Sequence, residues 1–551
     1  MSRLHAPLSV PGSTPLPRRL AALLCAALGA TLGPLAAAQE PAPGGTIQYG
    51  HFQEPSCLVA SWVQGWYLQR QFSDNLVSRG ADGKLWPWLA TSWSVSKDRK
   101  SYTFQLKPNV RFTDGTPLDA PAVAANFKRW LDVDPAKRNN AAFQYFGDKF
   151  ESATATGPLT VRVTLKTPYQ PFLTVLSHAT HGILSPASFE RSTAENCERP
   201  VGSGPFVVEK WNRGLNVVFK RNPNYNSAPA NARHQGPAYV EGLVWKFLKE
   251  PTVRYGSLLA GESDVIYDIP AVHWKEANEK FTVVRHITGG SPLRLQLNTA
   301  HPPFDDLRVR RALAHAADRQ RAVEVASQGA VPFEGNGALS QSAPEYLREL
   351  ASRYPFDPAQ ANRLLDEAGW TGRTPEGIRT RNGVPLTARV AYGAGGIVTP
   401  DIAQALQIVQ EQARAVGFNL VFKPTALADW WAGKNRGPND YDILPAYWTA
   451  SGAEVLQISW RPDAGDKPNP NNASRFQDPK LWALIREADQ TADDARRVQL
   501  YQQAQRLMVD SAAVVGLATL PVALASSPRL KGVWLAGGVG EPVFHDAHFV
   551  K

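Results

Sequence analysis

The sequence predicts a mixed α/β protein built from more than one lobe. At 551 residues the chain is longer than one hydrophobic core usually supports. Helix-like and strand-like patterns alternate along it, which favours sheets covered by helices. After residue 38, charge, Pro or Gly interrupts every apolar run within about a dozen residues, short of the ~20 that a membrane span needs. We therefore expect soluble α/β lobes.

The first 38 residues predict an export signal. Basic residues that include Arg18 and Arg19 precede the apolar run 20–35, and small residues follow up to Ala38. We expect cleavage after Ala38 and a mature protein in the periplasm. A membrane anchor, lipidation at Cys25 and twin-arginine export are the less favoured alternatives.

The charge pattern argues against a nucleic-acid partner. The formal charge of +10 falls to +7 when the signal, with three arginines and no acids, is removed. Basic and acidic residues alternate, as in 97–100 and 305–311, and no basic block is present. We interpret this charge as a solvated surface.

Two cysteines, Cys57 and Cys197, remain after cleavage. Outside the cytoplasm a disulfide between them is a reasonable hypothesis, which the sequence leaves open. The histidines are scattered, and His178 with His181 offers two metal ligands without a third. We therefore expect neither a metal site nor a cofactor.

Elements in the first half of the chain follow from apolar alternation for strands, near-helical spacing for helices and Gly or Pro for turns. The strand 46–49 is followed by the loop 51–55, a natural wall for a ligand. The further elements expected here are a helix within 61–77, strands within 88–106, a turn at 113–117, a helix at 120–131, a hairpin at 152–165, and strands at 206–211 and 215–220.

In the second half helices alternate with strands, and the Asn-, Pro- and Gly-containing stretch 224–237 is expected to be a surface loop. Predicted strands are 264–267, 293–298 and 441–444. Predicted helices are 253–260, 307–326, 358–368, 402–416 and 492–509.

Three segments carry a family resemblance: Leu106–Trp130 with its Asp-Gly-Thr-Pro turn, Pro200–Asn226 with Val-Gly-Ser-Gly-Pro, and Leu297–Arg319. The stretch Asp357–Trp370 adds a fourth. In this order and at this spacing they resemble the extracellular solute-binding proteins of the peptide/nickel class (family 5), which serve ABC importers. Each motif also has a scaffold role, since Gly and Pro suit turns and strand ends.

The resemblance implies a two-lobed periplasmic binding protein fold of the type II kind, with an extra subdomain and a ligand cleft between the lobes. By analogy, 39–76, 200–295 and 515–551 form lobe I, 77–199 the extra subdomain and 296–514 lobe II. It also implies a monomer whose partners are a small-molecule or short-peptide ligand and the membrane subunits of an ABC permease. Closure on the ligand would be driven by a higher affinity of the closed state.

The segment Tyr447–Glu454 departs from the family pattern. In peptide-binding relatives a Trp-x-x-Asp motif holds the free amine of the peptide, and Ser451 stands here at the place of the aspartate. A hydroxyl does not offset the desolvation of a buried ammonium, so ordinary free-amine peptides become less favoured. Glu454 is either a substitute carboxylate or a surface acid.

Other candidate ligand contacts follow from position. Trp448 and Thr449 belong to the motif, although core packing is the usual role of a Trp. Arg436 suits a ligand carboxylate because its guanidinium makes two parallel hydrogen bonds, and a solvated loop arginine is the alternative. The remaining candidates are Trp431 in the same loop and, after the first strand, His51, Gln53 and Glu54.

No catalytic motif argues for an enzyme. The sequence holds no Gly-x-Ser-x-Gly elbow, no His-Glu-x-x-His and no Walker loop, and Gly202-Ser203-Gly204 lies in the hairpin motif. We therefore predict a periplasmic subunit that captures a small peptide or peptide-like ligand. The alternative is a binding protein for an opine, a modified amino acid or a metallophore or nickel chelate.

Overall fold

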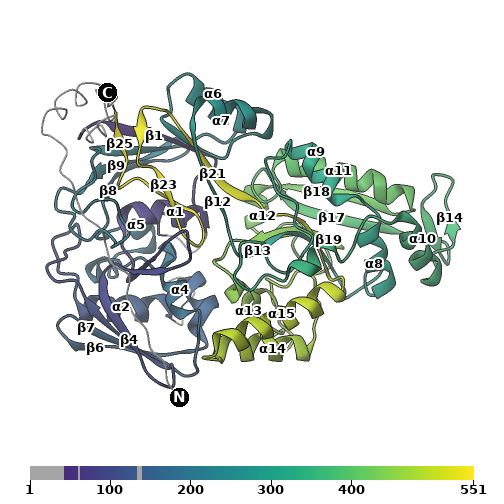
Figure 1. Cartoon of the computed structure of the whole chain (residues 1–551), viewed down its shortest axis with the longest axis horizontal. Coiled ribbons are helices and arrows are strands. Elements are labelled where there is room, and N and C mark those ends of the chain that lie inside the picture. The colour runs from purple at the N-terminus through teal and green to yellow at the C-terminus, as the bar shows by residue number, and fades with distance from the viewer. Residues whose placement is uncertain (1–42, 60–62, 133, 135–138, 551) are drawn as a thin grey trace, which may run out of the picture. The chain divides into compact units, whose positions relative to one another are not determined.

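The computed structural model describes residues 43–59, 63–132, 134 and 139–550, and residues 42–551 form one compact unit. The signal segment and Trp62 lie outside the described residues. Three larger sheets organise this part of the chain (Figure 1).

The largest sheet has seven strands in the order β12-β21-β11-β1-β10-β9-β8. Strand β1 is parallel to both of its neighbours, β10 and β11, whereas the other pairs are antiparallel. Most of this sheet comes from the first half of the chain, with β21 added from the C-terminal part. Its strands are β1 (Thr46–His51), β8 (Phe206–Asn212), β9 (Asn216–Arg221), β10 (Gly242–Phe247), β11 (Val265–Tyr267), β12 (Thr282–Ile287) and β21 (Pro521–Ser526).

Helices and short strands complete this region, which we call lobe I. Its helices are α1 (Val63–Phe72), α5 (Thr193–Glu198), α6 (Pro251–Leu259) and α7 (Trp274–Lys280). Two strand pairs near the C-terminus join β22 (Leu530–Lys531) to β25 (His548–Phe549) and β23 (Trp534–Ala536) to β24 (Glu541–Val543).

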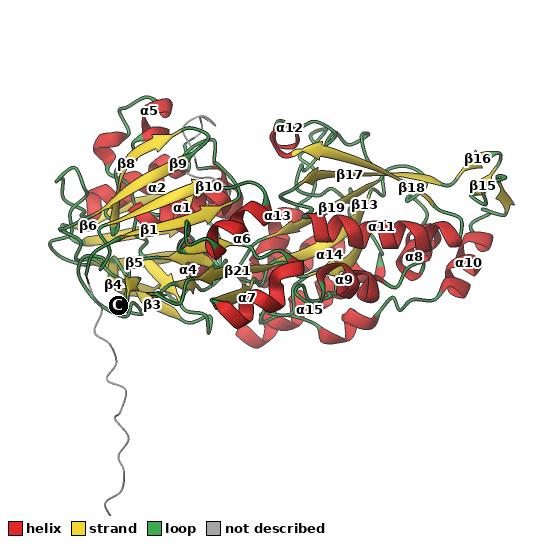
Figure 2. Ribbon diagram, turned by 90° about the horizontal axis from the view of Figure 1, so that it is seen from above, coloured by secondary structure: helices red, strands yellow, loops and turns green. Residues whose placement is uncertain are grey.

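The second sheet has five strands in the order β18-β17-β19-β13-β20, and the region around it is called lobe II. Figure 2 shows the helices α8, α9 and α11 alongside the strands β13, β17 and β19. The strands are β13 (Ser291–Leu297), β17 (Thr387–Ala394), β18 (Asn419–Ala426), β19 (Ile443–Trp448) and β20 (Val514–Ala518), with a small added sheet of β14 (Gly372–Arg373), β15 (Arg379–Arg381) and β16 (Val384–Pro385). The helices are α8 (Leu307–His315), α9 (Arg319–Ser327), α10 (Pro358–Glu367), α11 (Pro400–Ala415), α12 (Leu427–Trp431), α13 (Leu456–Ser459), α14 (Pro479–Gln490) and α15 (Asp494–Asp510).

A four-stranded sheet, β4-β5-β7-β6, forms the centre of the third region, which we call the subdomain. Its core is a separate cluster of buried side chains that includes Phe104, Phe127 and Phe172. The elements are β2 (Val77–Arg79), β3 (Leu85–Pro87), β4 (Ala90–Val95), β5 (Ser101–Leu106), β6 (Phe150–Gly157), β7 (Thr160–Leu165), α2 (Ala120–Trp130), α3 (Asn140–Ala142) and α4 (Phe172–Leu176).

The division into lobes by residue number stays a proposal, although two strands bear on its borders. Both β13 and β20 belong to the five-stranded sheet. The sequence division assigned 291–295 and 515–518 to the other lobe. We therefore propose that the chain crosses between lobes just before β13 and just after β20.

One helix expectation is wrong. The stretch 307–326 forms two helices, α8 and α9, with a break at Ala316–Asp318. Asp318 explains the restart, because its side chain accepts a hydrogen bond from the N–H of Arg321 and so caps the second helix. The loop 224–237 is also less exposed than expected, since Tyr225, Ser227 and Ala228 are buried.

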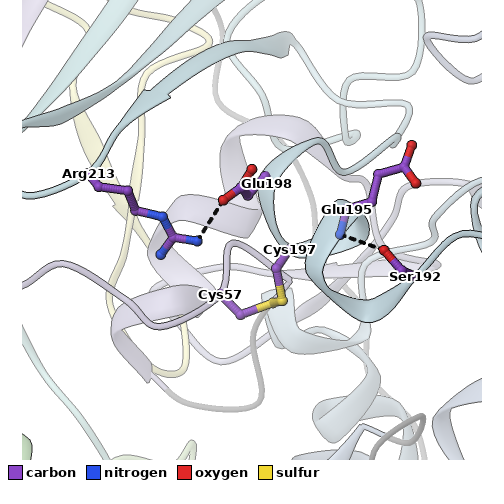
Figure 3. Close-up of a disulfide and its surroundings, with 6 residues drawn as sticks. All are labelled: Cys57, Ser192, Glu195, Cys197, Glu198 and Arg213. Atoms are coloured by element: carbon purple, nitrogen blue, oxygen red, sulfur yellow. Dashed lines mark hydrogen bonds and ion pairs between the residues drawn. A yellow bond between two sulfur atoms is a disulfide. The ribbon is translucent and has the colours of Figure 1, made fainter.

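The structure pairs the two cysteines that the sequence left open. Cys57 and Cys197 form a disulfide with their Cα atoms 4.6 Å apart (Figure 3). It ties the loop after β1 to α5, whose start is capped by the Ser192 hydroxyl. The bridge spans 140 residues of sequence, so it constrains a large loop of the unfolded chain.

No helix in the described ranges is long and apolar enough to span a bilayer.

Candidate functional site

The carboxyl ends of parallel strands in lobe I mark the first half of the candidate site. Strands β1, β10 and β11 run parallel, so His51, Leu248 and Asp268 lie at the same edge of the sheet. In α/β proteins ligands bind outside this edge of parallel strands. We call the residues that follow these strands the lobe I edge.

His51 is fully buried at the lobe I edge in an aromatic setting. Its ring centroid lies 4.8 Å from that of Tyr267 and 5.3 Å from that of Trp245. Its Nδ1 lies 3.2 Å from the backbone of Gln53, whereas Nε2 has no hydrogen-bond partner. Burial lowers the pKa of His51 to about 3, so the imidazole is neutral at physiological pH.

Gln53 adds a second unsatisfied group, because its side-chain Oε1 is buried without a partner. Unpaired buried polar atoms are rare and call for an explanation such as a bound polar group. The sequence prediction placed His51 and Gln53 in a ligand wall, and the structure brings both to one edge.

Asp268 is a charged residue of the lobe I edge. It follows β11, and its Oδ2 accepts one hydrogen bond of 3.3 Å from the guanidinium of Arg254. Arg254 is fully buried. Its Nε donates a hydrogen bond to the carbonyl of Tyr267, and its Nη1 donates to the carbonyls of Leu248 and Lys249. Arg254 therefore holds three backbone segments together at this edge.

The facing surface of lobe II begins at the end of β19. Burial and, second to it, the negative charge of Asp268 raise the pKa of Tyr447 to about 12, so the phenol lies within electrostatic reach of the lobe I edge. Trp448, the last residue of β19, packs against the cores of both lobe II and the subdomain. Thr449 is buried directly after it.

The chain crosses this region at Gly289 and Gly290. A Cβ on Gly289 would collide with the carbonyl of Ser451, and one on Gly290 with the carbonyl of Trp448. The crossing segment therefore lies directly against the backbone of the 448–451 segment, and only glycine permits this approach.

Ser451 is engaged in the described conformation. Its hydroxyl forms a 2.9 Å hydrogen bond with Nε2 of His178 from the subdomain, and its carbonyl accepts one of 3.3 Å from Arg79. Ser451 therefore connects lobe II to the subdomain. His178 is buried, stacks on Trp66, and is neutral because burial lowers its pKa.

Glu454 is buried, so the expectation of a surface acid is wrong. Its Oε1 accepts a 2.6 Å hydrogen bond from the N–H of Ser451, three residues earlier. This bond closes the turn 451–454 at the start of the helical segment Ala453–Ser459, whose N-cap residue is Gly452. The role of Glu454 toward a ligand stays a prediction.

A cavity of about 230 Å³ lies beside the turn 451–454. Burial raises the pKa of Glu454. The positive charge of Arg79 lowers this pKa, and the negative charge of Glu345 raises it. The lining is strongly charged, with residues from the subdomain and from lobe II: Arg79, Gln170, Pro171, Thr174, Pro344, Glu345, Ser451, Gly452, Glu454, Asp494, Arg497 and Tyr501.

Three residues that were predicted to contact the ligand have their described interactions away from these two surfaces. Glu54 accepts hydrogen bonds from the indole of Trp211 and the N–H of Gly214, so it fastens the β8–β9 hairpin. Arg436 lies over the rings of Trp430 and Trp431, at 5.2 and 5.6 Å from their centroids. Trp431 was expected in a loop, but it is the last residue of α12, and it is exposed.

Asp268 and Arg254 were not among the residues expected from the sequence. A signal existed for Asp268, because it is an acid directly after the predicted strand 264–267. Arg254 gave no such signal, since its partners are backbone carbonyls whose positions depend on the fold.

One cluster away from the lobe I edge resembles a metal-ligand set. His234, His545 and Asp546 place a ligand atom each within 4.8 Å of one another. However, the two imidazoles stack in parallel with centroids 4.0 Å apart, so no ion can lie in both ring planes. As arranged, Asp546 accepts a 2.9 Å hydrogen bond from Nδ1 of His234 and joins the 224–237 loop to the C-terminal segment.

Comparisons with known proteins agree with this architecture. The fold and the two facing surfaces define a two-lobed solute-binding protein. A family model of the bacterial extracellular solute-binding proteins, family 5, matches residues 84–469, and the chain belongs to this family.

Individual relatives match nearly the whole chain. The nickel-binding periplasmic protein of Escherichia coli K12 is 26% identical over 88% of this chain and 90% of the relative. The glutathione-binding protein GsiB of Pectobacterium atrosepticum is 29% identical over 85% of this chain and 87% of its own length. The crystal structure of NikA from Brucella suis in complex with Fe(III)-EDTA matches with a TM-score of 0.76 and 26% identity, covering 91% of this chain and 100% of that structure. These relatives are binding proteins.

Proposed function

We propose that this chain is the periplasmic substrate-binding subunit of an ABC importer for a small peptide or peptide-like ligand. The observation that carries the proposal is the family match over 84–469 together with unsatisfied polar atoms at the lobe I edge. Closure of the two lobes would remove the ligand from water and present the closed form to the permease subunits. No catalytic step is part of the proposal.

The proposed ligand contacts come from both lobes. His51 and Gln53 supply polar atoms without partners from lobe I, and Trp448 and Thr449 supply the facing wall of lobe II. Relatives that bind glutathione and a nickel species show that the family accepts chemically different cargo.

We further propose that the protein is exported by its first 38 residues and cleaved after Ala38. An exported mature chain would begin at Gln39, and intact-mass measurement of the periplasmic protein tests this. A mass that includes the first 38 residues contradicts cleavage at this site.

Native mass spectrometry of the exported protein, followed by denaturation to release any ligand, tests the function. We expect one small molecule per chain, and isothermal titration with glutathione and with dipeptides is the complementary measurement. Turnover of the bound molecule, or the absence of binding to any peptide, peptide-like compound or chelate, would overturn the proposal.

A chelate or modified amino acid is the second candidate, favoured by one observation. Ser451 lacks the charge of the amine-holding aspartate and already bonds to His178. A released ligand that carries a metal isotope pattern would favour the chelate over the peptide.

A further inference from the structure

The cavity of about 230 Å³ beside the turn 451–454 lies at the seam between the subdomain and lobe II, and we call it the seam pocket. The subdomain contributes Arg79 and residues within 170–174 to its lining. Lobe II contributes Glu345, the turn and residues of α15. None of the described lining residues belongs to the lobe I edge, so a solute in the seam pocket would contact the subdomain and lobe II.

Two carboxylates face the same point of the seam pocket. A Cβ placed on Gly452, which also lines the pocket, would lie 3.1 Å from Oε2 of Glu345 and 3.2 Å from Oε2 of Glu454. Only 5% of Glu454 is exposed, and its hydrogen bond from the Ser451 N–H goes to Oε1, so Oε2 has no partner in any other described residue. Oε2 of Glu345 accepts one long hydrogen bond, of 3.4 Å, from the N–H of Ala453. Unpaired oxygens of buried carboxylates call for a partner.

A guanidinium lies next to these carboxylates. Nη1 of Arg79 donates a 3.3 Å hydrogen bond to the carbonyl of Ser451, the residue before Gly452, and Nε donates to the carbonyl of Gly83. Nη2 of Arg79 donates to no residue in the described part of the chain, so it keeps N–H groups for another acceptor. Positive and negative charge therefore meet successive residues of one turn.

The free charges of the lining select a class of solute. Arg497 and Asp494 pair with each other at 2.5 Å, which leaves Arg79 and the two glutamates for an occupant. Burial raises the pKa of both glutamate carboxyl groups, as expected where desolvation outweighs the countercharge. A simple cation would leave Arg79 without an acceptor, and a simple anion would face two carboxylates. A zwitterion satisfies both signs of charge.

The size and spacing of the seam pocket fit an α-amino acid. This solute carries its ammonium and its carboxylate on one carbon, and the two signs of charge in the pocket meet residues whose Cα atoms are about 3.8 Å apart. At about 30 Å³ per molecule, the volume corresponds to about seven waters. Pockets for drug-sized ligands measure about 300–1,000 Å³, so this one suits a smaller solute than a peptide.

We propose that the seam pocket binds a free α-amino acid, with its ammonium between Glu345 and Glu454 and its carboxylate on Arg79. This second site goes beyond the proposed function, because its solute is not the ligand held between lobes I and II. An amino acid that contacts the subdomain on one side and lobe II on the other stabilises the conformation in which these two regions touch.

Isothermal titration of the exported protein with the common protein amino acids tests the site. For the amino acid that binds best, two matched compounds follow: its amide, which lacks the carboxylate, and its N-acetyl form, which lacks the ammonium. Glu345→Gln and Arg79→Gln each remove one charge from the pocket, and the glutamine at 345 keeps an acceptor for the N–H of Ala453.

Two charge-removing variants outside the lining serve as matched controls. Glu349→Gln removes a carboxylate that pairs with Arg506 at 2.8 Å. Arg496→Gln removes a guanidinium of α15 that pairs with Glu487, also at 2.8 Å. Neither change alters a residue of the seam pocket, so both controls should bind the amino acid as the wild type does.

We expect one amino acid to bind per chain. The amide, the N-acetyl form and each of the two pocket variants should weaken binding at least about tenfold, because each removes a charge-assisted hydrogen bond. Unfolding temperatures within a few degrees of the wild type show that a variant folds, and Glu345→Gln decides alone if Arg79→Gln does not. Wild-type affinity in a folded pocket variant, equal affinity for the N-acetyl form, or no binding of any amino acid overturns the inference and leaves the proposed function intact.

Discussion

The two surfaces that face each other between the lobes differ in how fully their polar groups are satisfied. On lobe II, the segment from Trp448 to Glu454 stands where the sequence predicts the ligand motif, yet Ser451 and Oε1 of Glu454 already have partners within the protein. On lobe I, His51 and Gln53 keep buried atoms without partners, and Asp268 keeps exposed surface. The comparison shows that a motif position does not by itself identify the atoms that remain available for a ligand.

The largest expected effect tests the support of the lobe I edge. Arg254→Gln leaves the carbonyls of Leu248, Lys249 and Tyr267 without their donor. Each buried unsatisfied group costs about 1–3 kcal/mol, and we expect a total loss of about 3–5 kcal/mol in the free energy of unfolding. Urea denaturation measures it.

Arg436→Gln is the control for this prediction. The guanidinium of Arg436 lies over two Trp rings, so its loss should cost about 0.5–1 kcal/mol. Equal losses in the two variants would show that Arg254 does not organise the edge.

A second prediction uses the pH dependence of stability. The pKa of His51 is lowered to about 3 by burial, from 6.5 in the unfolded chain. The unfolded state therefore binds a proton that the folded state does not, and the contribution of His51 is lost as pH falls below 6.5. Between pH 7 and pH 5 this amounts to about 2 kcal/mol, at 1.36 kcal/mol per unit.

His51→Gln removes this titration, so its free energy of unfolding should fall less between pH 7 and pH 5 than that of the wild type. Other titrating groups are shared by the two proteins and cancel in the difference. Parallel stability curves from urea denaturation at several pH values would contradict a buried, neutral His51.

The fold was predicted from the sequence better than the site was. Strands such as Thr46–His51 and helices such as Pro358–Glu367 follow from local periodicity and caps, which depend on neighbouring residues. The break between α8 and α9 was missed because the apolar pattern continues across Asp318. The pattern alone does not show whether this residue lies within one long helix or caps the start of a second helix.

Site residues are harder to predict because their environment comes from distant segments. The position of His51 directly after a strand predicted that it lines the site. That its Nε2 has no hydrogen-bond partner could not be predicted, because the ring is surrounded by Trp245 and Tyr267 from distant segments. The setting of Asp268 was harder still to predict, because its partner Arg254 is held by backbone carbonyls whose positions depend on the fold.

The smallest expected effect separates the backbone hydrogen bond of Glu454 from a ligand contact. A Gln side chain keeps an acceptor oxygen, so Glu454→Gln should keep the hydrogen bond from the Ser451 N–H and change stability by less than about 0.5 kcal/mol. Glu454→Ala leaves this N–H without its acceptor and should cost about 1 kcal/mol. Thermal unfolding measures both. If this hydrogen bond is its whole role toward the ligand between the lobes, Glu454→Gln also binds a free-amine peptide with wild-type affinity, whereas a tenfold loss in that variant would assign the countercharge of the amine to lobe II and remove the contrast between the two surfaces.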